Sequence, residues 1–145
     1  MKSVLFSLSV LTIALSTSPV TVASEESGFT RDGHTLDSLA KVKQEVTKGR
    51  AILLDVREKA EWDRGHLRAS SLLPLSVIRT GEFTDEQKKL LPKDKPVYCH
   101  CASGGRVLIV SELLRERGHD IRPLKGGFLT LVKAGFRKAP SKSAD

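Results

Sequence analysis

The stretch that decides the fold is VYCHCASGGRVLIV, residues 97–110. An apolar segment over residues 95–100 leads into a glycine-containing loop over 101–106, and apolar residues at helical spacing continue over 107–117. A strand, a loop and a helix in this order are typical of a parallel sheet covered by helices. Ligands of such sheets bind beyond the carboxyl ends of the strands, where this loop is expected to lie.

The chain on both sides of this stretch continues the same alternation. Apolar runs predict further strands over 51–56, 71–75 and 121–124. Helical spacing predicts helices over 35–47, 85–91 and 128–134, and a polar turn is expected over 61–66. The run AILLDV at 51–56 suits a strand that is buried on both faces. We therefore expect an α/β fold with one domain and a doubly wound parallel sheet that has helices on both faces.

The first residues differ in kind from the rest of the 145-residue chain. Lys2 gives a positive start, an apolar run follows, and small residues end the segment at Ala23 or Ser24. The run is shorter than the ~20 residues of a spanning helix, so residues 1–23 are predicted to be a signal peptide. The protein is then exported, in bacterial style to the periplasm. Further divisions are expected as follows: a linker over 24–34, the domain over 35–137 and a C-terminal tail over 138–145.

The formal net charge of +7 at pH 7 favours encounters with small anions. Basic residues alternate with acidic ones, and aromatic residues make up only 5% of the chain. A platform for stacking nucleic acid bases needs more aromatic side chains, so nucleic acid is not expected as a partner. Membrane contact is not expected after signal cleavage, and the sequence identifies no protein partner.

The cysteines of the chain are Cys99 and Cys101. On one strand they would point to the same face, about 6.6 Å apart. A disulfide needs Cβ atoms about 3.5–4.5 Å apart, so this pair is a poor structural bridge. A metal site is also not expected, because the chain has no second pair of ligands at the spacing of a zinc site. A chemical role for a thiol is the better explanation.

The loop after the strand can curl so that successive backbone N–H groups face one point, as anion-binding nests do at the start of helices. Cys101 at the centre of such a nest is favoured as a thiolate nucleophile. Its alternative is an inert buried cysteine. Two glycines are expected to provide close approach and positive φ, and an arginine provides two donors for an oxyanion. The expected anion loop consists of Ala102, Ser103, Gly104, Gly105 and Arg106.

Several segments in this order resemble the rhodanese family over residues 35–136. They are LDVRE at 54–58, EW at 61–62, GHL at 65–67, PLS at 74–76, CASGGR at 101–106 and LKGG at 124–127. The chain departs from the family where it has Ala69-Ser70 in place of the frequent Gly-Ala, and Val107 in place of a frequent Ser.

The resemblance implies a sulfurtransferase that works without a metal or organic cofactor. Cys101 would take sulfane sulfur from a small anionic donor such as thiosulfate, or from a persulfide, and hold it as a persulfide. It would then pass this sulfur to cyanide or a thiol acceptor. The amides of residues 102–106 would stabilise the outer sulfur, and Arg106 would hold the anionic end of the donor.

Alternatives to this function remain open. Related phosphatases and arsenate reductases have five residues between cysteine and arginine, whereas this chain has four, and a non-catalytic binding module would keep the fold alone. Asp55 and Arg57 either support the loop from the neighbouring strand end or form a strand-terminal ion pair. Cys99 is either a buried strand residue or a resolving thiol that attacks the persulfide. His34 and His119 are expected on the surface.

Overall fold

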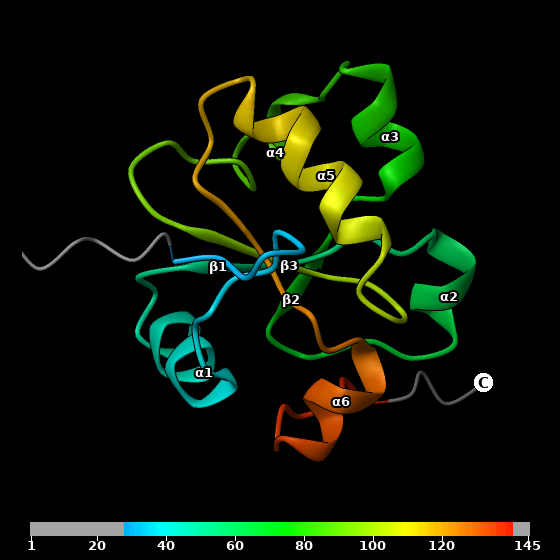
Figure 1. Cartoon of the computed structure of the whole chain (residues 1–145). Coiled ribbons are helices and arrows are strands. Elements are labelled where there is room, and N and C mark those ends of the chain that lie inside the picture. The colour runs from blue at the N-terminus through cyan, green and yellow to red at the C-terminus, as the bar shows by residue number, and fades with distance from the viewer. Residues whose placement is uncertain (1–27, 141–145) are drawn as a thin grey trace, which may run out of the picture.

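The structure, a computed structural model, describes residues 28–140 and has one four-stranded sheet at its centre (Figure 1). Its strands are β1 (Ile52–Asp55), β2 (Ser70–Leu72), β3 (Val97–His100) and β4 (Ile121–Pro123). They are arranged in the order β2-β1-β3-β4, and every neighbouring pair is parallel. The expected parallel α/β sheet is therefore confirmed.

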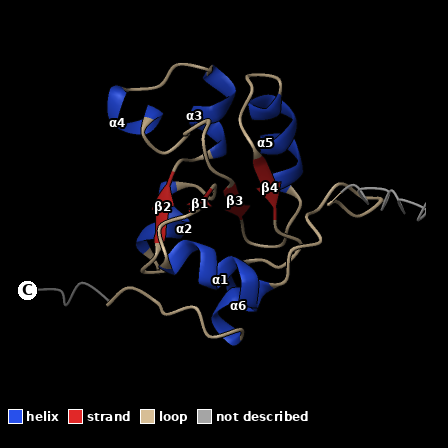
Figure 2. Cartoon of the chain, turned by 90° about the vertical axis from the view of Figure 1, so that its left-hand side faces the viewer, coloured by secondary structure: helices blue, strands red, loops and turns tan. Residues whose placement is uncertain are grey.

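Helices cover both faces of this sheet (Figures 1 and 2). One face carries α1 (Leu39–Thr47) and α6 (Phe128–Lys133). The opposite face carries α3 (Leu75–Thr80), α4 (Asp85–Lys88) and α5 (Arg106–Arg115). The short helix α2 (Lys59–Asp63) lies beside the loop that precedes α5 in Figure 1. The doubly wound arrangement is thus present as expected.

Each face of the sheet has its own hydrophobic core, because successive side chains of a strand point to opposite faces. Leu54 and Cys99 belong to the core beneath α3 and α5, whereas Leu53 and Tyr98 belong to the core beneath α1 and α6. The two central strands, β1 and β3, carry the most deeply buried side chains. Burial on both faces explains why the sequence of β1 is almost continuously apolar.

The register of the central strands brings their polar ends together. Asp55 at the end of β1 is the partner of His100 at the end of β3. Cys101 follows directly, so the carboxyl ends of both strands deliver polar side chains to the same edge as the loop. This edge is where parallel sheets bind their ligands.

Two short helices were not expected from the sequence. The polar turn expected over 61–66 contains α2, and α3 follows Pro74 where no helix was predicted. In α3 the buried residues are Leu75 and Ile78, which gives too few apolar positions for a helical period to be recognised. The first helix begins at Leu39 rather than at residue 35, because Ser38 caps it by accepting a hydrogen bond from Lys41 N.

The segment before α1 contacts the fold, although the sequence predicts a linker over 24–34. Phe29 and Thr35 form an antiparallel bridge, and Thr35 N donates to Pro123 O at 2.8 Å. The guanidinium of Arg115 lies 4.1 Å from the centre of the Phe29 ring. Residues 28–34 are therefore part of the folded unit, which corrects this end of the expected linker.

The expected tail over 138–145 also begins inside the fold. Lys138 bridges to Leu67, and Ala139 N donates to His66 O at 2.9 Å. The predicted signal peptide and residues 141–145 lie outside the described residues. Between residues 28 and 140 the structure contains no helix of the length and apolarity that crossing a bilayer requires.

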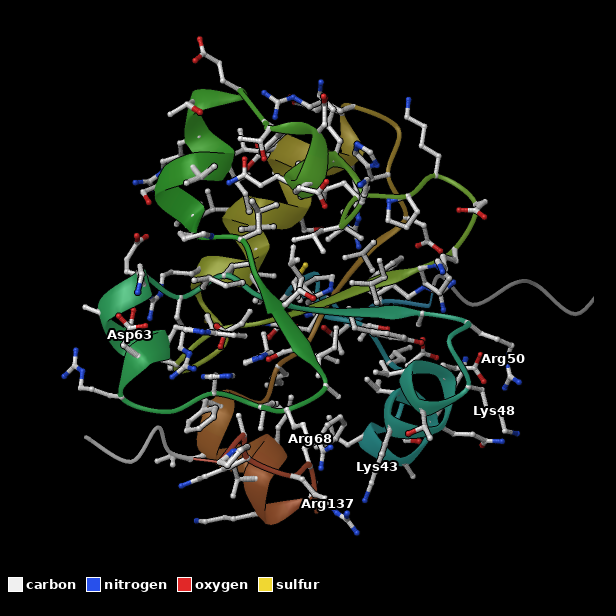
Figure 3. All side chains as sticks on the ribbon, turned by 180° about the vertical axis from the view of Figure 1, so that it is seen from behind. Lys43, Lys48, Arg50, Asp63, Arg68 and Arg137 are labelled. Atoms are coloured by element: carbon white, nitrogen blue, oxygen red, sulfur yellow. The ribbon has the colours of Figure 1, made fainter. Side chains whose placement is uncertain are left out.

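The positive charge of the chain lies on its surface, as Figure 3 shows for the labelled cations. Lys43, Lys48 and Arg50 project from α1 and the turn after it, and all are exposed. Arg68 and Arg137 are exposed on the same side of the molecule. Among residues 28–140 the buried cation is Arg57, which lies at the edge of the sheet where the loop begins.

Candidate active site

The loop between β3 and α5 surrounds the sulfur of Cys101. The thiol is 1% exposed, and Gly104 N donates a hydrogen bond to Cys101 Sγ over 3.1 Å. Within residues 28–140, the N–H groups of Ala102, Ser103 and Gly105 donate to no protein acceptor. The loop therefore holds one sulfur atom with one donor and keeps further donors available for a second atom.

The two glycines of the loop have different roles. Gly104 has φ +95°, and a Cβ placed on it would lie 2.4 Å from Lys125 O. Gly105 has φ −77° and ψ −45°, and nothing lies within 4 Å of its added Cβ. The expectation of positive φ is thus confirmed for Gly104 and wrong for Gly105, which caps α5 in an ordinary helical conformation.

The turn before α6 packs directly against this loop. A Cβ on Gly127 would lie 1.8 Å from Ala102 O, so the two backbones are in contact. Phe128 N donates to Cys101 O at 2.8 Å, and Leu124 N donates to Cys99 O at 2.9 Å. Gly127 is therefore required by this close approach to the loop, whereas a Cβ on Gly126 would meet the side chain of Thr130.

Arg106 is held by a partner that the sequence did not assign. Its Nη1 and Nη2 donate to the two carboxylate oxygens of Glu61 over 2.6 and 2.7 Å. The Arg106 hydrogen bonds lower the pKa of Glu61 to about 2, so the carboxylate stays charged and the pair stays intact at neutral pH. Glu61 Oε2 also accepts from Glu58 N at 3.0 Å, which fixes it at the first turn of α2.

Asp55 and Arg57 form the strand-terminal ion pair that was one of the two expected arrangements. Arg57 Nη2 lies 2.7 Å from Asp55 Oδ2, and both side chains are buried. Arg57 also donates to Gly65 O at 2.9 Å and stacks 4.2 Å from the centre of the Phe128 ring. In residues 28–140 neither side chain hydrogen-bonds the loop itself, so any support they give is indirect and passes through Phe128.

Cys99 and His100 are fully buried beside the loop. Cys99 Sγ lies 3.9 Å from Val97 O, and burial raises the pKa of the Cys99 thiol far above its usual range. Burial also lowers the pKa of His100, whose Nε2 lies 3.7 Å from Asp55 Oδ2. Both residues are therefore neutral at physiological pH. Both cysteines are free, and a neutral Cys99 thiol is a poor resolving nucleophile.

The histidines expected on the surface differ in their exposure. His34 is 6% exposed, and its Nε2 lies 2.9 Å from Gly104 O. His119 is half-buried, with Nδ1 3.4 Å from Pro92 O. The surface prediction is wrong for His34, which is buried against the loop, whereas His119 stays partly exposed at the surface. No group of three or more His, Cys, Asp or Glu side chains in residues 28–140 is arranged to hold a metal ion.

A family model described as the rhodanese-like domain matches residues 38–134, more than half of the chain. The protein YqhL of Bacillus subtilis (strain 168), which is uncharacterized, is 36% identical over 80 residues. A tRNA sulfurtransferase of Desulfurococcus amylolyticus is 34% identical over 90 residues. These alignments cover 54% and 62% of this chain, but only 59% and 16% of the two relatives.

Comparison with solved structures also finds a rhodanese-related protein. A crystal structure of a rhodanese-related protein from Thermoplasma volcanium matches with a TM-score of 0.57 and 28% identity. That alignment covers 70% of this chain and 93% of the other. Residues 38–134, which the family model matches, include the loop and the turn before α6 and begin after His34.

The packing of the loop predicts that its glycines differ in their tolerance of a methyl group. Gly127→Ala is expected to lower the free energy of unfolding by about 1–3 kcal/mol, because its Cβ would overlap the backbone of Ala102. Gly105→Ala is expected to change it by less than about 1 kcal/mol, since the position is open and helical. Urea unfolding of the two variants measures the difference, and equal losses would contradict the described contact.

Proposed function

The chain belongs to the rhodanese-like domain family, and on that premise we propose that it is a sulfurtransferase in which Cys101 carries sulfane sulfur as a persulfide. The observation that carries this proposal is the position of Cys101 Sγ. It accepts a hydrogen bond from Gly104 N, inside a loop whose other N–H groups have no protein acceptor among the described residues. The similarity to the tRNA sulfurtransferase of Desulfurococcus amylolyticus supports the same class of reaction.

The first half-reaction loads the cysteine. The Cys101 thiolate attacks the outer sulfur of thiosulfate, the new S–S bond forms, and the bond to the sulfonate sulfur breaks. Sulfite leaves with the bonding electron pair, and Cys101 becomes a persulfide. The Gly104 N–H donates a hydrogen bond to the attacking sulfur over 3.1 Å.

The second half-reaction transfers the sulfur. A thiolate or cyanide attacks the outer sulfur of the persulfide, and Cys101 leaves as a thiolate with the electron pair. The N–H groups of Ala102, Ser103 and Gly105, which have no protein acceptor among residues 28–140, would stabilise negative charge on the outer sulfur. Four residues separate Cys101 from Arg106, so the ring of donors is small and suits a sulfur atom.

Arg106 contributes less free charge than the sequence suggested. Its guanidinium is paired through both Nη atoms with Glu61, which balances its charge. A doubly charged donor must therefore compete with the Glu61 carboxylate for the same guanidinium. Backbone amides, rather than Arg106 alone, are then the main donors to the transferred sulfur.

The proposed first half-reaction predicts that thiosulfate increases the mass of the protein. The reduced protein should gain the mass of one sulfur atom when it is incubated with thiosulfate without an acceptor, and a thiol or cyanide should remove it. Cys101→Ser should gain nothing. Cys99→Ser is the matched control and should gain sulfur as the wild type does, because Cys99 is buried and neutral.

Intact-mass spectrometry of the three proteins measures this gain. Absence of sulfur from the wild type after thiosulfate and after a persulfide donor would reject the proposed reaction. Turnover of an aryl phosphate in the same preparation would favour the phosphatase alternative instead.

The Glu61–Arg106 pair predicts a separate effect on donor affinity. Glu61→Gln keeps one oxygen that can accept from the Arg106 guanidinium but removes the competing charge, so KM for thiosulfate should fall about fivefold, equivalent to ~1 kcal/mol. The control is Asp63→Asn on the same helix, which removes a carboxylate paired with Lys59 and should leave KM unchanged. Steady-state kinetics at fixed ionic strength compares them, and a KM that rises in Glu61→Gln would refute competition for Arg106.

We also infer that residues 1–23 direct export, on the composition of that segment. Expression with the full N-terminus in a bacterium should yield a periplasmic protein that begins at Ser24 or Glu25. Fractionation followed by N-terminal sequencing measures this, and recovery of the uncleaved chain in the cytoplasm would overturn it.

A further inference from the structure

A tight turn over Thr30–His34 lies against the outside of the sulfur-binding loop, in a segment that precedes the matched family domain. Thr30 N donates to His34 O at 2.7 Å, and His34 N donates to Thr30 Oγ1 at 3.0 Å. Gly33 closes the turn with φ +89°. The bridge between Phe29 and Thr35 attaches the turn to the fold, so the His34 ring is held in a defined place.

The His34 ring has one acceptor in reach of Nε2, the carbonyl oxygen of Gly104 at 2.9 Å. A carbonyl only accepts, so Nε2 carries the proton and donates it. The contact is buried, since His34 is 6% exposed. Gly104 has no side chain, so the hydrogen bond from His34 acts directly on the backbone of the loop.

The effect follows from the geometry of the peptide group. In a planar trans peptide the C=O and the N–H point in opposite directions. The bond from His34 to Gly104 O therefore turns the N–H of Gly105 to the other side of the same peptide, away from His34. That N–H has no protein acceptor among residues 28–140. The preceding N–H, of Gly104, already donates to Cys101 Sγ.

We propose that His34 is a positioning residue of the sulfur-binding loop, which fixes the peptide between Gly104 and Gly105 so that its N–H is presented to the transferred sulfur. The inference rests on the proposed sulfurtransferase function for its purpose. Its geometric part, the control of the loop by His34, applies to any reaction of the Cys101 thiolate.

Asp32 lies beside the other nitrogen of the imidazole. Its Oδ2 lies 3.3 Å from His34 Nδ1, and Lys125 Nζ lies 3.6 Å from the same carboxylate oxygen. The hydrogen bond from the Thr30 hydroxyl and the contact with His34 lower the pKa of Asp32, which therefore remains a carboxylate at neutral pH. A neutral imidazole has an N–H at one nitrogen only, so Nδ1 donates to Asp32 only in a ring that carries both protons, and the bond from Nε2 to Gly104 O does not depend on Asp32.

The test compares variants that keep or remove the donor at position 34. His34→Phe fills the same space without an N–H, whereas the side-chain amide of His34→Gln still donates. We expect His34→Phe to lower kcat and the neutral-pH rate of Cys101 alkylation by iodoacetamide about tenfold. This loss is smaller than the loss that removal of a whole oxyanion donor causes. The pH midpoint of alkylation should rise, KM for thiosulfate should change little, and His34→Gln should recover most of the loss.

Site-resolved mass spectrometry of the alkylated peptide gives the rate at Cys101 alone. His119→Phe is the matched control, because His119 also contacts a backbone carbonyl but lies at Pro92, and it should match the wild type. A folded His34→Phe with unchanged alkylation and kcat would overturn the proposal. So would a His34→Gln that loses as much as His34→Phe.

His34→Leu keeps the test decisive if His34→Phe does not fold, because the leucine side chain is smaller than a phenyl ring and also lacks an N–H. We expect a loss of about tenfold in alkylation rate and in kcat, since the donor to Gly104 O is absent. An unchanged rate would then overturn the role of His34. Rapid alkylation of a wild type that accepts no sulfur from any donor would reject the sulfurtransferase function and leave the positioning role standing.

Discussion

The hydrogen bond from Gly104 N to Cys101 Sγ is the interaction on which the site depends. Cys101 is 1% exposed, so the thiolate that the proposed reaction needs would have to receive from backbone N–H groups the hydrogen bonds that water provides elsewhere. Backbone donors do this only while their peptides keep one orientation. The loop is held by three contacts, which come from the Gly127 turn, from His34 and from the Glu61–Arg106 pair. The orientation of its peptides is therefore determined by tertiary contacts.

The sheet places these supports together. Parallel strands β1 and β3 end at the same edge, which brings the Asp55–Arg57 pair beside the start of the loop. Arg57 lies on the Phe128 ring, and Phe128 N donates to Cys101 O. The ion pair thereby fixes α6 relative to β3 without a bond to the loop. A buried charge pair of this kind is costly to break, so it keeps this frame in place.

Local patterns in the sequence predicted the sheet, its two helical layers and the loop, because those features depend on apolar periodicity and glycine content. Long-range pairing was beyond them. Glu61 stands in a polar turn pattern, and only the fold brings it to Arg106, 45 residues away. His34 precedes the first apolar period, and its contact with Gly104 spans 70 residues. Gly105 was misjudged for a related reason, since composition does not tell which of two adjacent glycines has positive φ.

Cys99 and Cys101 separate the effects of burial and of backbone polarity. Both belong to the same hydrophobic core and are almost equally buried, so burial alone does not distinguish the two thiols. Cys99 Sγ faces an acceptor, Val97 O, which favours the protonated thiol and agrees with the raised pKa of Cys99. Cys101 Sγ instead accepts a hydrogen bond from Gly104 N. The backbone group that faces the thiol thus changes from a carbonyl at Cys99 to an amide at Cys101, and this difference supports the proposal that Cys101 is the nucleophile.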